Sequence, residues 1–142
     1  MQVNKGQSRS NGVISLLLEG EAIVLARDFN KLVSSEFPTA LLAEAVVEAA
    51  GSTASGLLQQ VPAIRAHLSC VRTYLLGAGR EPDELVKLQK NGAAVDPAVI
   101  DFSLFTHGFG ALAVVAVVES LMSLIGTIEK ALVLKSREEE VC

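Results

Sequence analysis

Few side chains in this 142-residue sequence have the types and the spacing that catalysis or metal binding requires. His67 and Cys70 are three residues apart, so a helix would place them on one face. A zinc site needs more ligands at short spacing, and the other candidates, His107 and Cys142, lie far along the chain. A cysteine nucleophile with a histidine base also needs a third group that orients the base. We therefore predict a surface histidine and a core cysteine, and no catalytic residue, metal or cofactor.

The run from Gly51 to Gly56 has the two glycines of a phosphate-binding loop but lacks its charged part. That motif continues with lysine and then serine or threonine, whereas two leucines follow here. Nearly all side chains from Ala49 to Gly56 are small, which lowers helix propensity. We expect close contact with another helix backbone in return. The run therefore predicts close helix packing at Gly51, Ala54 and Gly56.

Three glutamates could meet inside a helical protein. Bundles that hold two metal ions pair such glutamates with Glu-x-x-His steps, and this sequence contains no such step. Glu44 and Glu48 are therefore interpreted as a solvated face. Glu119 has apolar neighbours on both sides, and a buried carboxylate must be paired or protonated. It either points outward at a polar edge, pairs with Arg65 or Arg72, or has a function of its own.

Basic residues concentrate in and after the third predicted helix, which makes this region the candidate surface for an anionic partner such as nucleic acid. Tyr74 is the only aromatic side chain there that could stack on a base. The net charge of −4 gives no overall attraction to nucleic acid or to an anionic membrane. We favour a solvated face for these residues, which are Arg65, Arg72, Arg80, Lys87 and Lys90.

The stretch from Phe102 to Val118 carries no formal charge except on His107, if that side chain is protonated. Its part from Ala111 to Val118 is apolar on every side, so the sequence predicts that it is buried all round. The stretch continues far enough to cross a bilayer. However, Glu119 near its middle would cost roughly 2.5–3.5 kcal/mol on insertion, and no Trp or Tyr flanks it. We therefore favour a buried bundle helix and keep a membrane span as an alternative.

Apolar residues recur at helical spacing through most of the chain, and no alternation is long enough to predict a strand. Phe37-Pro38 should end the first helix, because a residue before proline avoids helical geometry, and Asp96 is the expected N-cap of the final segment. The prediction is an all-α protein, an antiparallel four-helix bundle with a long, very apolar C-terminal helix and a short extra helix before it. The helices should cover about 13–34, 38–60, 62–76, 81–90 and 97–134, between a flexible arm at 1–12 and a charged tail at 136–142, with 13–135 as one domain.

Three apolar seams from the earlier helices must cover the final helix and also one another, so we expect a second copy or another protein to complete the cover. The expected interface comprises Val114, Val117, Val118 and Leu121. The resulting prediction is a non-enzymatic helical assembly protein that self-associates or docks to a protein partner. Two cysteines make no disulfide framework, which favours the cytoplasm. A small nucleic-acid-binding accessory protein and a membrane-associated helical protein are the alternatives.

Overall fold

The computed structural model of the chain describes residues 5–76 and 96–141. Every element in these two ranges is helical, which confirms the all-α class. The predicted short helix at 81–90 lies outside the described residues, as do Arg80, Lys87 and Lys90. The elements are α1 (Lys5–Glu36), α2 (Thr39–Ala50), the 3₁₀ turn η1 (Gly51–Thr53), α3 (Ala54–Leu76), α5 (Pro97–Phe105) and α6 (Phe109–Val141).

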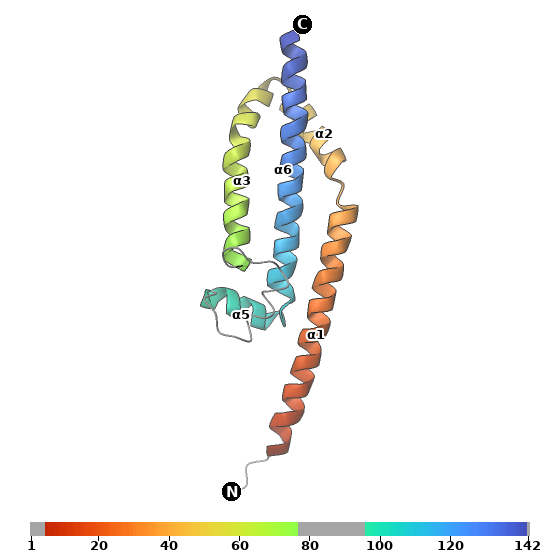
Figure 1. The fold of residues 1–142 in the computed structure, drawn as a ribbon, viewed down its shortest axis with the longest axis vertical. Coiled ribbons are helices and arrows are strands. Elements are labelled where there is room, and N and C mark those ends of the chain that lie inside the picture. The colour runs from red at the N-terminus through yellow and green to blue at the C-terminus, as the bar shows by residue number, and fades with distance from the viewer. Residues whose placement is uncertain (1–4, 77–95, 142) are drawn as a thin grey trace.

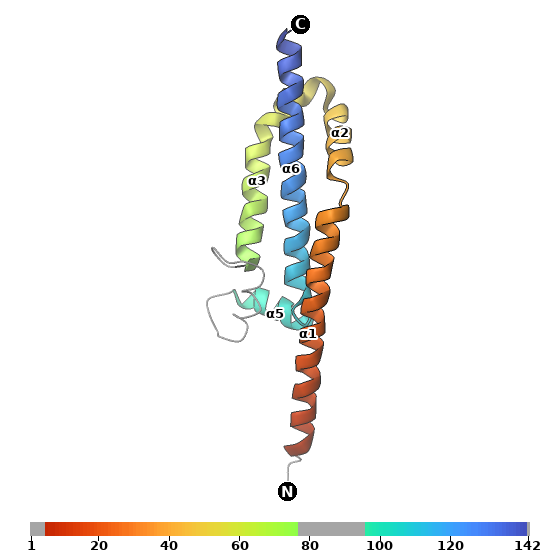
Figure 2. The ribbon, with the colours of Figure 1, turned by 45° about the vertical axis from the view of Figure 1, so that its right-hand side comes forward.

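Helix α6 is the axis on which the other helices pack. Figure 1 shows α6 between α3 on one side and α1 with α2 on the other. Helices α1 and α6 run in the same direction, and α3 runs against them (Figure 1). Because α2 follows α1 on the same side of α6, the two helices act as one interrupted rod (Figures 1 and 2). The antiparallel arrangement was therefore correctly predicted for α3 against α6 but not for α1.

The break between α1 and α2 lies at Phe37-Pro38, as the sequence predicted. The carbonyl of Pro38 accepts a hydrogen bond from the Leu42 amide at 3.0 Å, so α2 starts directly after the proline. The predicted helix from 38 to 60 is wrong, because α2 ends at Ala50 and Gly51 adopts a φ of +47°. Such a backbone conformation is easy for glycine and turns the chain out of the helix.

The two predicted terminal segments are helical over most of their lengths. The backbone is helical from Lys5 onward, so the helix includes most of the predicted arm at 1–12. Helix α6 continues to Val141 and so includes most of the predicted tail at 136–142. Polar composition misled the prediction of the tail, because charged residues such as Lys135, Arg137 and Glu138 have good helix propensity. Propensity does not explain the helix at 5–12, which contains two glycines and two serines. Figures 1 and 2 show α1 extending well past the corner between α5 and α6.

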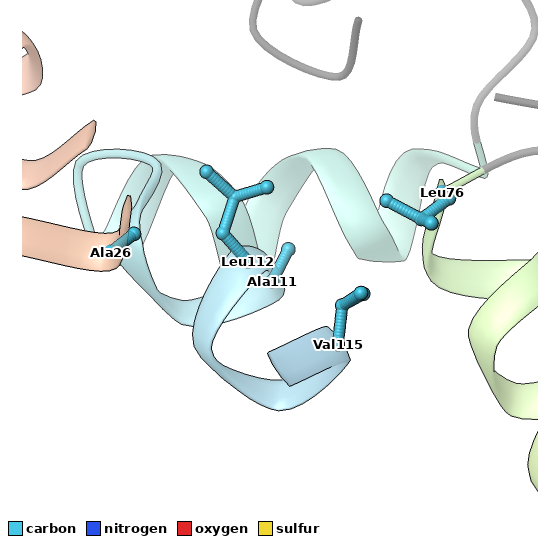
Figure 3. Close-up of a cluster of buried hydrophobic side chains, with 5 residues drawn as sticks. All are labelled: Ala26, Leu76, Ala111, Leu112 and Val115. Carbon is cyan, nitrogen blue, oxygen red and sulfur yellow. The ribbon is translucent and has the colours of Figure 1, made fainter. Parts of the chain in front are cut away.

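The first core cluster joins α1, α3 and the start of α6. It contains Ala26, Leu76, Ala111, Leu112 and Val115, all of which are buried (Figure 3). Leu76 is completely buried, and full burial of a leucine side chain stabilises a fold by about 1.5–3 kcal/mol. Ala111, Leu112 and Val115 belong to the stretch that the sequence predicted to be buried all round. That prediction is only partly correct for the single chain, because Val114 and Val117 of the same stretch are 38 and 42% exposed.

The second core cluster lies farther along α6, where α2 and the start of α3 cover it. Its buried members are Ala43, Ile128 and Leu132, and partly buried side chains such as Ala54 and Leu57 pack against them. The two clusters lie at different positions along α6. The first packs α1 and the end of α3 onto it, and the second packs α2 and the start of α3 onto it. They also fix which parts of α6 remain uncovered.

Candidate functional site

One face in the N-terminal half of α6 is only partly covered by the described part of the chain. Val114, Val117 and Leu121 are 38, 42 and 36% exposed, and their spacing places them on one side of the helix. Phe102 of α5 lies at the head of this row, beside Gly110, and is 42% exposed. We call these four residues, Phe102, Val114, Val117 and Leu121, the apolar stripe.

The stripe ends where α2 begins to cover α6. Ile128 and Leu132 are 7 and 11 residues beyond Leu121, which places them on the same side of the helix. They are only 4 and 1% exposed, because the second core cluster surrounds them. The first half of the same face stays open because α1 and α3 pack on the opposite side, around Val115. The exposed stripe therefore follows from the placement of the neighbouring helices.

Three of the four residues predicted as an interface belong to this stripe. Val118 does not, because it is 6% exposed and lies in the interior of the single chain. The sequence prediction missed Phe102, whose place was not evident from helical spacing within α6. A signal was present in Gly110, since a glycine in an otherwise apolar helix often marks a close approach by another group. The stripe itself carries no group for acid–base chemistry.

The corner between α5 and α6 sets the position of Phe102. His107 has a φ of +52° and Gly108 a φ of +93°, so the backbone turns sharply between the two helices. The hydroxyl of Thr106 accepts a hydrogen bond from the Gly110 amide at 2.9 Å. A Cβ atom on Gly110 would lie 2.7 Å from that hydroxyl oxygen and 2.8 Å from Cζ of Phe102. Gly110 is therefore required for this close packing.

Two ion pairs join α3 to α6. Arg72 Nε lies 2.8 Å from Glu119 Oε1, and Arg65 pairs with Glu129 one step farther along the antiparallel helices. The structure thus confirms the second of the three interpretations of Glu119, an ion pair with a helix 3 arginine. All four side chains are 29 to 42% exposed. Pairs of this kind contribute about 0.2–1 kcal/mol each, so they orient α3 on α6 more than they stabilise it.

Two of the five basic residues in the predicted surface for an anionic partner are paired with glutamates in the structure. The guanidinium groups of Arg65 and Arg72 each donate a hydrogen bond to a glutamate of α6, so they are less available to bind a phosphate. The remaining three predicted basic residues belong to the chain outside the described ranges. The described part of helix α3 consequently offers no unpaired arginine for nucleic acid.

The small-residue run forms the corner between α2 and α3 rather than a packed helix segment. No atom lies within 4 Å of a Cβ position built on Gly51 or Gly56. The prediction of close backbone packing is wrong at these two glycines, because the turn directs them away from the other helices. Ala54 does pack, against the second core cluster.

The other candidate residues for chemistry lie on the surface. His67 and Cys70 are both exposed, so the prediction of a core cysteine is wrong. Glu44 and Glu48 are exposed, which agrees with a solvated face. Among the described residues no three His, Cys, Asp or Glu side chains are grouped closely enough to hold a metal ion.

Asp96 joins α3 to α5 through two hydrogen bonds. Its carboxylate accepts one from the Tyr74 hydroxyl and one, at 2.8 Å, from the Ala98 amide. The second bond confirms the predicted N-cap of α5. The Tyr74 hydrogen bond, followed by the Ala98 bond, lowers the pKa of Asp96 below its ordinary value. The same contact raises the pKa of Tyr74.

Two segments are long and apolar enough to cross a membrane by length and composition alone. They are Thr39–Leu76, with a mean hydropathy of 1.2, and Phe109–Glu138, with a mean hydropathy of 2.1. The first is interrupted at Gly51. The second is the central helix of the fold, and the core helix of a water-exposed protein passes the same test. These segments are therefore weak indicators of a membrane span.

Comparisons with known proteins add a family to this geometry. The family model of transcription factor AP-2 matches residues 1–128. Human transcription factor AP-2 gamma is 32% identical over 116 residues, which cover 80% of this chain and 26% of that protein. The chain therefore spans about a quarter of the length of this relative. No solved structure matches the chain.

Proposed function

Because the chain belongs to the transcription factor AP-2 family, we propose that it is a DNA-binding regulator of transcription that works in the nucleus as a homodimer. In this proposal the described helices bring two copies together, and the apolar stripe lies in the contact between them. The match over residues 1–128 supports the regulatory function. The exposure of Val114, Val117 and Leu121 supports the role of the helices.

Membership of this family corrects several sequence predictions. The prediction of a structural assembly protein without a role at nucleic acid is wrong, because the family consists of transcription factors. The family gives no support to a membrane-associated protein either. A role with nucleic acid, which the sequence prediction ranked as an alternative, is the one that the family favours. The prediction that the chain is not an enzyme is confirmed, since these proteins are regulators. A transcription factor acts inside the cell, but the cytoplasm as its location is not supported.

The chemistry of the stripe favours a second copy as the occupant. The stripe is apolar and uncharged, and exposed apolar residues that form a contiguous row mark interaction sites. A face without charges is complementary to itself, so a two-fold axis can place the same surface of both copies at the interface. The exposed fractions of about two fifths indicate that the single chain only half covers these side chains.

The ion pairs of α3 argue against DNA contact through that helix. Arg65 and Arg72 would have to leave Glu129 and Glu119 before either could neutralise a phosphate. The net charge of −4 adds repulsion over the whole chain. We therefore assign the described helices to pairing of the copies, and DNA contact to basic residues elsewhere in the assembled protein.

Two measurements on the purified chain test this proposal. Light scattering at tens of micromolar should give twice the chain mass of 14.9 kDa. Fluorescence anisotropy with a labelled DNA duplex should show binding that weakens with salt, because phosphate contacts release counterions. A monomer would remove the pairing role, and an absence of DNA binding at low salt would remove the DNA-binding role of this chain.

A further inference from the structure

A small pocket lies where α1 ends and α2 begins, against the side of α6. The break between α1 and α2 beside α6 is visible in Figures 1 and 2. The volume of the pocket is about 180 Å³, which is comparable to an engineered cavity of about 150 Å³ that holds one benzene molecule. Its lining consists of four hydroxyl side chains, one carboxylate and the two apolar residues Val33 and Phe37. The proposed function does not use this pocket.

Three of the four hydroxyl groups have already donated their hydrogen atoms to backbone carbonyls. Ser34 Oγ and Ser120 Oγ each donate to the carbonyl four residues earlier, at 2.7 and 3.0 Å. Thr39 Oγ1 donates to the Phe37 carbonyl at 3.3 Å. A hydroxyl group has one hydrogen atom to donate and two lone pairs that accept. These three oxygen atoms therefore offer acceptor sites to a ligand.

The carboxylate of Glu119 adds a negative charge to the same wall. Arg72 reaches it from α3 and donates to Oε1 at 2.8 Å. Because a carboxylate has about four acceptor sites, this bond leaves acceptor capacity on Glu119. No lysine, arginine or histidine of the described ranges lines the pocket. A ligand must therefore supply the donors, and a positive charge would be favoured.

The end of α1 also favours positive charge in the pocket. Val33 and Ser34 belong to the last turn of α1, a helix of 32 residues whose last turn holds no basic residue. The carbonyl groups at the C-terminal end of a helix carry partial negative charge, which attracts cations. The first amide of α2, that of Thr39, donates to the Phe37 carbonyl at 2.7 Å, so it is not available to an anion.

We propose that this pocket binds a primary ammonium group on an unbranched alkyl chain, such as the end of a lysine side chain. An ammonium group has three N–H donors on a rotatable bond, so it can reach several separate oxygen atoms. A guanidinium group instead pairs best with both oxygens of one carboxylate, and Arg72 already occupies Oε1 of Glu119. The inference is independent of the proposed homodimer, because none of the lining residues belongs to the apolar stripe.

The pocket also has room for the alkyl chain. Ser120 is 9% exposed and lies at the bottom, whereas Ser34 and Ser123 are exposed and lie at the mouth. Val33 and Phe37 are partly buried and form an apolar wall. Long basic side chains lay their methylene groups along apolar surface of this kind. A lysine side chain therefore matches the apolar wall with its methylene groups and the oxygen atoms with its ammonium group.

A nuclear magnetic resonance titration of the full chain with n-butylammonium chloride tests this inference. The backbone amide signals of Ser34, Thr39 and Ser120 should shift in a saturable manner, with the weak affinity expected of so small a ligand. 1-Butanol has the same chain without the charge, and tetramethylammonium has the charge without N–H donors, so both should shift these signals much less. Equal shifts with tetramethylammonium, or no saturable shift at about 100 mM n-butylammonium, would overturn the inference.

Two matched pairs of variants locate the binding. Glu119→Gln should weaken it about tenfold, because a hydrogen bond to a charged group contributes more than one between neutral groups. Its control is Glu129→Gln, which breaks the other ion pair between α3 and α6 outside the pocket. Ser34→Leu should block the mouth, whereas Ser35→Leu changes the exposed neighbour outside the lining and should leave binding intact. Binding that survives Ser34→Leu, or that Glu129→Gln weakens as much as Glu119→Gln does, would place the ligand elsewhere.

A lysine derivative distinguishes the two sources of such an ammonium group. Nα-acetyl-lysine N-methylamide carries the same alkylammonium chain on a peptide backbone. Binding as tight as that of n-butylammonium would support a lysine of a partner protein as the ligand. Binding of n-butylammonium alone would support a free alkylamine, because the mouth would then exclude the backbone of a partner. If neither compound binds, the inference is wrong.

Discussion

The guanidinium of Arg72 on α3 donates a hydrogen bond from Nε to Oε1 of Glu119 on α6, at 2.8 Å. This contact gives a partner to the one carboxylate in the otherwise uncharged stretch from Phe109 to Ile128 of α6. The same register of α3 against α6 also pairs Arg65 with Glu129.

We expect the Arg72–Glu119 pair to have a small but measurable coupling energy. Arg72→Ala and Glu119→Gln should each lower the free energy of unfolding, and a double-mutant cycle should give a coupling of about 0.2–1 kcal/mol, because both side chains are about a third exposed. Chemical denaturation measures all four proteins of the cycle. Lys130→Ala on the exposed side of α6 is the control and should change stability by less than either variant. Strict additivity of the two single variants would contradict a direct interaction.

The sequence alone could predict that Glu119 needs a partner but not which arginine supplies it. Arg65 and Arg72 are seven residues apart and share a face, so both fit the same helical pattern. The choice depends on the register of α3 against α6, which tertiary packing sets. Pro62 also misled the prediction, since it lies inside α3 instead of starting it.

Periodicity predicted that the chain is helical, but it did not predict which apolar residues face a neighbouring helix. Leu25 and Leu32 of α1 and Val71 of α3 are at helical spacing and yet are 59, 58 and 45% exposed. The break at Pro38 and the N-cap at Asp96 follow from local chemistry and were correctly predicted. The exposure of Cys70 was not, because an apolar pattern does not reveal that α3 packs on α6 along one side only. The corner at Gly51 depends on a positive φ. The sequence did not predict it, because the small residues around Gly51 are also compatible with a continuous helix.

Gly110→Ala should destabilise the fold by about 1–3 kcal/mol, because the added methyl group overlaps the Thr106 hydroxyl and the Phe102 ring. Gly56→Ala in α3 is the matched control, since nothing lies within 4 Å of its Cβ position. That substitution should stabilise the protein by about 0.4–1 kcal/mol through the lower entropy of the unfolded chain. Thermal unfolding of both variants is the measurement. Equal effects of the same sign would show that the corner is not closely packed.

The positive φ of His107 should make this position sensitive to the shape of its side chain. His107→Gly should keep or raise the free energy of unfolding, because glycine adopts this conformation without a steric penalty. His107→Val should lower it by about 1–2 kcal/mol, since a β-branched residue is strained there. Denaturant unfolding distinguishes the two variants. A valine variant as stable as wild type would mean that the corner relaxes to a negative φ.

The contact between Tyr74 and Asp96 should make stability depend on pH at both extremes. The folded-state pKa of Asp96 is lowered, so its contribution is present above the ordinary aspartate range and is lost as the pH falls through the lowered value. The pKa of Tyr74 is raised above 10.0, so its contribution is present below that value and is lost as the pH rises through the folded-state pKa. Tyr74 is the only tyrosine and there is no tryptophan, so phenolate absorbance reports it alone. Asp96→Asn should shift that titration to lower pH, and an unchanged curve would exclude the contact.

A charge on the apolar stripe should separate assembly from folding. Val117→Asp should give a folded monomer, because this side chain is 42% exposed in the single chain and would become an unpaired buried charge only between two copies. Val115→Asp should unfold the chain instead, since Val115 is 1% exposed within the first core cluster. Light scattering gives the mass of each variant, and circular dichroism gives its helix content.

Leu41→Asp provides the control for a charge on an exposed apolar residue away from the stripe. Leu41 is 68% exposed on α2, so this variant should keep both the dimer mass and the helix content. If Val117→Asp also keeps the dimer mass, then the stripe is not between the copies. If Leu41→Asp dissociates while Val117→Asp does not, the copies meet on the α2 side of the molecule instead. The comparison of these three substitutions therefore assigns the interface to one face of the fold, because each places the same charge in a different environment.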